Sequence, residues 1–174
     1  NQATGEWTIG FFENFAVYQC RFWDYESIQI KKDETVVKLK NNTTRLTLSL
    51  KHKNRASCNI AFGKDNPQKY ILCNGKHLPD YPLTDTTPFI DNGYRTDSVT
   101  LTGYLRNPPS SRPFDVSIPD MITGKEEKYQ TDIDSLGRFT LRFPVLNSHN
   151  VFIDWGRTTI WSAVEPGETY FLYV

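Results

Sequence analysis

Cysteine, methionine, histidine and net charge are all scarce in this sequence. It has three cysteines, one methionine and three histidines in 174 residues, and twenty basic residues balance twenty acidic ones. Because nucleic-acid-binding proteins need a positive patch, this balance argues against a nucleic-acid partner. No run approaches the ~18 apolar residues of a membrane span, and no signal peptide is evident. We therefore expect a cytosolic protein or a mature exported one.

The sequence also lacks the motifs of common enzyme and metal sites. It contains no C-x-x-C and no G-x-S-x-G, and its serines have no identifiable His and acid partners. The spacing of Cys58, Cys73 and His77 fits no standard zinc pattern. We therefore predict no catalytic residue, no cofactor site and no metal site, and we do not expect this chain to be an enzyme.

The odd number of cysteines leaves two interpretations open. The number alone favours buried thiols that act as small hydrophobic side chains. A second interpretation is a hairpin in which Phe62 pairs with Lys69. Cys58 would then lie opposite Cys73, within reach of a disulfide bond. The sequence thus predicts a Cys58–Cys73 disulfide as the alternative to buried thiols.

Aromatic residues, by contrast, are abundant: they make up 14% of the chain, and 38% of all residues are hydrophobic, which supplies a folded core. The clearest local pattern begins at Asp134. Asp134 and Gly137 favour a turn, through a short polar side chain and freedom to adopt positive φ. Phe139, Leu141 and Phe143 then alternate with polar residues, as in a strand with one face on a core.

Similar patterns predict an all-β protein with two antiparallel β domains. A proline-rich stretch places the boundary near Gly93, so the domains cover residues 1–93 and 94–174. Seven short strands in the second domain are typical of an immunoglobulin-like or transthyretin-like sandwich. The expected strands are 26–31, 35–40 and 44–51 in the first domain, and 99–106, 114–118, 128–132, 138–143, 151–155, 158–164 and 169–174 in the second.

Aromatic residues are densest between positions 7 and 25, and we interpret this stretch as a candidate interaction surface. Packing within a core, or between the domains, is the alternative role for the same rings. The residues of the candidate surface are Phe11, Phe12, Phe22, Trp23 and Tyr25.

A carbohydrate-binding β-sandwich module is a second hypothesis for the function, with a glycan as the ligand. Flat rings with polar edges stack on sugars, so this hypothesis requires two or more exposed, roughly coplanar rings on one face. The exposure of Trp7, Trp23 and Trp161 is the relevant test.

The second half of the chain resembles the N-terminal β-sandwich of envelope thioredoxin-like proteins, the TlpA/ResA-type disulfide reductases of Gram-negative gut anaerobes. In that family the sandwich precedes a redox domain. In the first half, segments 10–13 and 22–25 look like an additional module that some members carry ahead of the sandwich. The segments that carry the resemblance in the second half are 102–105, 134–139, 143–144, 151–155 and 165–169.

The resemblance implies a function without chemistry in this chain. The redox domain of the family holds a C-x-x-C, which this sequence lacks, and it would follow Val174. The implied function is that of a non-catalytic spacer or recognition module. It would position the C-terminal thioredoxin-like domain, or dock the protein substrates of that domain, in the periplasm or at the cell envelope. A stand-alone protein remains the alternative.

Overall fold

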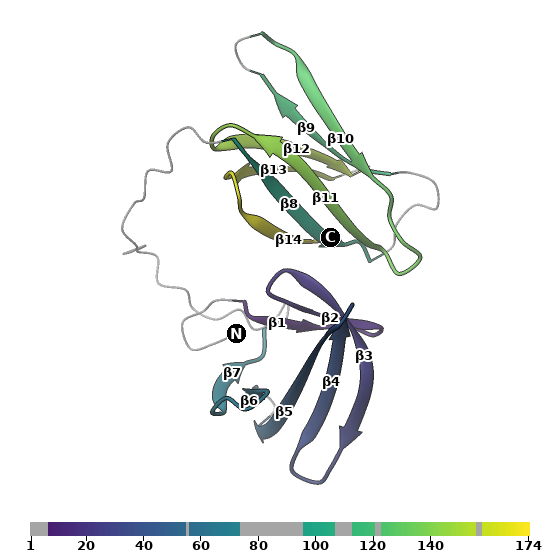
Figure 1. Ribbon diagram of the computed structural model, residues 1–174, viewed down its shortest axis with the longest axis vertical. Coiled ribbons are helices and arrows are strands. Elements are labelled where there is room, and N and C mark those ends of the chain that lie inside the picture. The colour runs from purple at the N-terminus through teal and green to yellow at the C-terminus, as the bar shows by residue number, and fades with distance from the viewer. Residues whose placement is uncertain (1–6, 55, 74–95, 107–112, 121–122, 156–157) are drawn as a thin grey trace, which may run out of the picture. The chain divides into compact units, whose positions relative to one another are not determined.

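The computed structural model describes residues 7–54, 56–73, 96–106, 113–120, 123–155 and 158–174 (Figure 1). All regular structure in these residues is β-strand, which confirms the predicted all-β class. The chain divides into two compact units, Asn1–Thr87 and Pro88–Val174. The expected boundary near Gly93 lies outside the described residues.

The first unit contains a seven-stranded antiparallel sheet whose strands follow one another in chain order. Each strand therefore pairs with its neighbours in sequence, which makes the sheet an antiparallel meander. The strands are β1 (Ile9–Phe11), β2 (Phe15–Tyr18), β3 (Arg21–Ile30), β4 (Thr35–Asn41), β5 (Thr44–Asn54), β6 (Ser57–Phe62) and β7 (Gln68–Ile71).

The hairpin between β4 and β5 shows how the sequence produces this sheet. Leu39 pairs with Leu46, and Val37 pairs with Leu48, so the apolar side chains of both strands share one face. Lysines alternate with them on β4 and stay exposed. The hairpin turns at Asn42, whose φ of 50° lies in the left-handed region that asparagine tolerates. Local sequence alone therefore determines this part of the fold.

The second unit contains two sheets with one core between them. The four-stranded sheet has the order β10-β9-β12-β13, and the three-stranded sheet has the order β11-β8-β14. All seven strands lie at the predicted positions, with ends that differ by a few residues. They are β8 (Asp97–Tyr104), β9 (Phe114–Pro119), β10 (Glu126–Thr131), β11 (Arg138–Val145), β12 (His149–Trp155), β13 (Thr158–Val164) and β14 (Thr169–Tyr173).

One strand pair departs from the predicted antiparallel arrangement. β14 runs parallel to β8, with Thr169 opposite Thr100 and Tyr173 opposite Tyr104. The turn after β13 leads the chain into the other sheet instead of folding it back beside β13. At that crossing, the Gly167 N–H donates to the Ser98 carbonyl at 3.2 Å. A sequence pattern records that a turn is present but not which sheet the next strand joins, so the direction of β14 could not be predicted.

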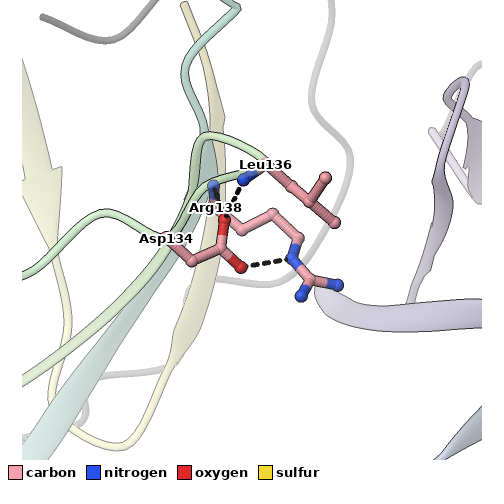
Figure 2. A network of polar contacts seen from close by, with 3 residues as sticks. All are labelled: Asp134, Leu136 and Arg138. Atoms are coloured by element: carbon pink, nitrogen blue, oxygen red, sulfur yellow. Dashed lines mark hydrogen bonds and ion pairs between the residues drawn. The ribbon is translucent and has the colours of Figure 1, made fainter. Parts of the chain in front are cut away.

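The turn between β10 and β11 is organised by the carboxylate of Asp134 (Figure 2). Its Oδ1 atom accepts the backbone N–H groups of Leu136 and Arg138, each at 2.9 Å, and its Oδ2 atom accepts Arg138 Nε–H at 2.7 Å. Gly137 completes the turn with a φ of 81°. A Cβ atom at Gly137 would lie 2.2 Å from the Leu105 carbonyl oxygen, so only glycine fits there.

Substitution of Asp134 should separate the two roles of its carboxylate. Asp134→Ala removes the carboxylate that accepts these three hydrogen bonds and should lower the free energy of unfolding by about 1–3 kcal/mol. Asp134→Asn keeps an oxygen for the backbone N–H groups and loses only the partly exposed ion pair, so it should cost less than about 1 kcal/mol. Urea unfolding followed by circular dichroism measures both values, and equal losses would contradict the assignment.

The core of the second unit depends on close contact between its two sheets. The ring of Phe139 on β11 stacks on the ring of Phe114 on β9, with 3.7 Å between centroids and 20° between planes. Gly103 on β8 leaves room for this ring, since a Cβ atom there would lie 2.2 Å from Phe139 Cζ and 2.9 Å from the Leu172 carbonyl oxygen. The missing side chain at Gly103 therefore lets Phe139 span the two sheets.

Gly103→Ala should destabilise the second unit by about 1–3 kcal/mol, because the buried Phe139 ring and the backbone of β14 cannot both move away from the added methyl group. Urea unfolding measures the loss, with Thr140→Ala on the exposed side of β11 as the control. We expect the control to change stability by less than about 0.5 kcal/mol. Wild-type stability in Gly103→Ala would disprove the packing argument.

Candidate interaction surfaces

The predicted register of the last hairpin in the first unit is wrong. β6 and β7 pair Cys58 with Tyr70, whereas the predicted register placed Cys58 opposite Cys73. The two registers differ by an odd number of residues, and such a shift moves every side chain of one strand to the other face. The observed register puts Tyr70 in the core, with 4% of its surface exposed, and leaves Lys69 in solvent. The predicted one would have turned Lys69 toward the core.

The predicted Cys58–Cys73 disulfide is therefore absent. All three cysteines lie in the described residues, and all three are thiols. Burial raises the pKa of the Cys20 thiol and of the Cys58 thiol above their ordinary values. A thiol with a raised pKa holds less reactive thiolate at neutral pH. The thiols of Cys20 and Cys58 are thus suited to packing and poorly suited to nucleophilic attack.

Thiol titration under non-reducing conditions should find three thiols per unfolded chain. In the folded protein, Cys20 and Cys58 should react slowly with iodoacetamide near pH 7. Their rates should rise only as the pH passes above the ordinary cysteine pKa of about 8.5, because burial favours the protonated form. Mass spectrometry of tryptic peptides assigns the rate of each residue. A count of one thiol per unfolded chain would instead show that a disulfide is present.

The five aromatic residues of the candidate surface lie on β1, on β3 and in the turn between β1 and β2, and the structure gives them different surroundings. Trp23 is buried in the core, 7% exposed, and its Nε1–H donates to the Tyr18 carbonyl at 3.3 Å. Tyr25 is partly buried and donates its hydroxyl to the Phe12 carbonyl at 2.8 Å. Burial raises the pKa of Tyr25, which helps it to keep this proton. Trp23 therefore bonds to the end of β2, and Tyr25 bonds to the turn between β1 and β2. Both side chains link β3 to the part of the chain before it.

Phe12 and Phe22 both pack against Phe15 in the first unit. The ring of Phe12 stacks on Phe15 at 5.0 Å, and Phe15 meets the edge of Phe22 at 5.2 Å. Both partners of Phe15 are partly buried, and Phe15 itself is 2% exposed. Such stacked and edge-to-face pairs stabilise a fold beyond the area that they bury.

Phe11 is the most exposed residue of the predicted set, at 43%. It lies on the edge strand β1, where Phe11 pairs with Ala16 of β2. Trp7, just before β1, is 42% exposed and reaches Gly10, where a Cβ atom would lie 2.7 Å from its ring. Trp7 was not among the predicted surface residues, although the density of aromatic residues in this stretch pointed to it. We call Trp7 and Phe11 the β1 aromatic edge.

The second unit exposes two other aromatic residues, Trp161 and Tyr173. Trp161 on β13 is 68% exposed, and its ring meets Phe152 of β12 with 3.7 Å between centroids and 63° between planes. The two residues are direct partners in the strand register. Trp161 lies on the face of β13 opposite the buried Val164, on a strand at the end of its sheet.

The described residues hold no helix, and therefore none that is long and apolar enough to cross a membrane. Within the same ranges, no three His, Cys, Asp or Glu side chains gather as metal ligands would, and His77 lies outside them. No family model, curated protein or solved structure matches this chain. The resemblance to envelope thioredoxin-like proteins therefore stays a prediction.

Proposed function

We propose that this chain is a non-catalytic recognition module that docks protein partners through the β1 aromatic edge. The exposure of Phe11 is the observation that carries the proposal. Aromatic side chains are enriched at protein interfaces, where they supply large contact areas with few rotatable bonds. Phe11 is 43% exposed on a sheet edge that has no need of it for the core. It is therefore available to a partner.

The hairpin behind Phe11 is rigid enough to present it. The Phe12 N–H donates to the Phe15 carbonyl at 2.9 Å, and the Phe12 carbonyl accepts the Tyr25 hydroxyl at 2.8 Å. Pre-organised anchors bind more tightly, because less side-chain and loop entropy is lost when the complex forms. The bonds of Phe12 thus fix the backbone next to the proposed anchor.

The resemblance suggests which partners this module serves. In an envelope thioredoxin-like protein, the module would position a C-terminal redox domain or dock its protein substrates, in the periplasm or at the cell envelope. An immunoglobulin-like or transthyretin-like sandwich is the corresponding interpretation of the second unit. Its seven strands in two sheets around one core support that interpretation. Its parallel β8–β14 pair departs from the antiparallel pairing that the sequence predicted for this sandwich.

Carbohydrate binding is less well supported as the function. Trp23 is buried, and the exposed residues Trp7 and Trp161 belong to different units. The Phe152 and Trp161 rings cross at 63°, so they do not form the flat platform that a sugar would stack on.

Phe11→Ala should weaken binding of this chain to the proposed thioredoxin-like domain at least about fivefold, because a truncated anchor costs more than about 1 kcal/mol. The full reading frame beyond Val174 provides the partner: if it contains a C-x-x-C domain, that domain is expressed separately and titrated by fluorescence anisotropy. Ile30→Ala is the matched control, since Ile30 is 82% exposed on β3. Equal affinities for Phe11→Ala and wild type would refute the proposed surface.

A further inference from the structure

The outer edge of β13 is uncharged and carries an exposed tryptophan. β13 ends the four-stranded sheet, and among the described residues β12 is its only strand partner. From Thr158 to Val164 its sequence is Thr-Thr-Ile-Trp-Ser-Ala-Val, with no charged residue and no proline. Thr159, Trp161, Ser162 and Ala163 are exposed. A strand edge of this composition is able to accept another strand.

Two of the other three edges of the second unit carry features that hinder strand addition. β10, at the other end of the same sheet, carries Glu126, Glu127 and Lys128. β11, at one end of the three-stranded sheet, carries two arginines and Pro144. Charges and proline on an edge strand block pairing with another chain, because they must be desolvated or lack a donor. β14, at the other end of the three-stranded sheet, also lacks charge and proline, but its three middle residues are partly buried. At the centre of β13, by contrast, Trp161, Ser162 and Ala163 are exposed.

We propose that β13 is a self-association edge, on which the β13 strand of a second copy of this chain pairs antiparallel. Trp161 is the middle residue of the strand, and a two-fold axis there joins the two four-stranded sheets into one. In this register Thr159 of each copy lies opposite Ala163 of the other, and Ile160 lies opposite Ser162. Each β-branched residue thus meets a smaller one.

Charge also favours a second copy as the occupant. No charged residue of β13 meets another in the antiparallel register, so self-pairing carries no like-charge repulsion. In the sequence, the uncharged run stands between residues of opposite sign, Arg157 before it and Glu165 after it. Two antiparallel copies of this sequence therefore match an end of one sign to an end of the other. A strand with a net charge would bring like charges together when it pairs with its own copy.

Trp161 supplies the side-chain contact at the centre of the edge. Trp161 is 68% exposed, and its ring makes an edge contact with the ring of Phe152. Aromatic residues near the centre of an interface contribute most of its binding energy. A single strand pair buries less surface than a standard interface, so the dimer is weak and its formation depends on protein concentration. This edge lies in the second unit and is independent of the β1 aromatic edge in the first.

Sedimentation velocity of the chain, from about 5 to about 500 µM, tests the proposal. Wild type should shift from monomer toward dimer as the concentration rises. Thr159→Lys with Ala163→Lys places like charges opposite each other and should weaken association at least about tenfold. Thr159→Lys with Ala163→Glu places opposite charges across the same pairs and should restore it. Phe11→Ala should leave association unchanged.

Two controls keep the test decisive. Circular dichroism verifies that each variant is folded, and Thr140→Lys adds a charge at an exposed position of β11 without altering β13. A wild-type chain that stays monomeric throughout overturns the proposal and leaves the edge to a strand of another protein. Dimers that persist in the double lysine variant, or that the opposite-charge pair does not restore, overturn it as well.

Discussion

The stacking of Phe139 on Phe114 is the contact on which the second unit depends. The two rings come from different sheets and lie 3.7 Å apart, so they connect layers that share no backbone hydrogen bonds at that point. This contact requires the bare backbone of Gly103, and it is anchored by the turn at Asp134, from which β11 begins. A sheet with one apolar face needs such a partner layer, because neither layer can exclude water alone.

The first unit forms its core in a different way. Its seven strands follow chain order, so each pairing closes only a short loop, and local sequence largely decides the fold. Core burial then selects the register: β7 aligns so that Tyr70 enters the core and Lys69 stays in solvent. The same choice separates the thiols of Cys58 and Cys73. The chemistry of this unit is thus a consequence of packing.

The two proposed binding surfaces differ in kind. The β1 aromatic edge presents side chains, through Trp7 and Phe11, and is suited to a protein partner that supplies a pocket. The β13 edge presents backbone together with Trp161, and is suited to another strand. Under the two proposals, the module holds one partner while it associates with its own copy. Neither surface needs a catalytic group.

The sequence by itself determined the all-β class and most strand positions, because alternation and turn residues are local signals. It missed the hairpin of β2 and β3, since the turn residues Gln19 and Cys20 adopt positive φ without the usual Gly or Asn. The sequence pattern also predicted that this strand starts at residue 26, whereas β3 begins at Arg21. The bulge after Tyr25 interrupts the alternation on which that prediction rested.

Only the tertiary structure decided which strands lie at sheet edges and which rings are exposed. Phe11, Trp23 and Trp161 are all large aromatic residues in strands, yet their exposed fractions are 43%, 7% and 68%. The difference arises from sheet order and the pairing register, which depend on contacts between strands. Local patterns carry no record of such contacts, so the sequence could indicate an aromatic surface but not its members.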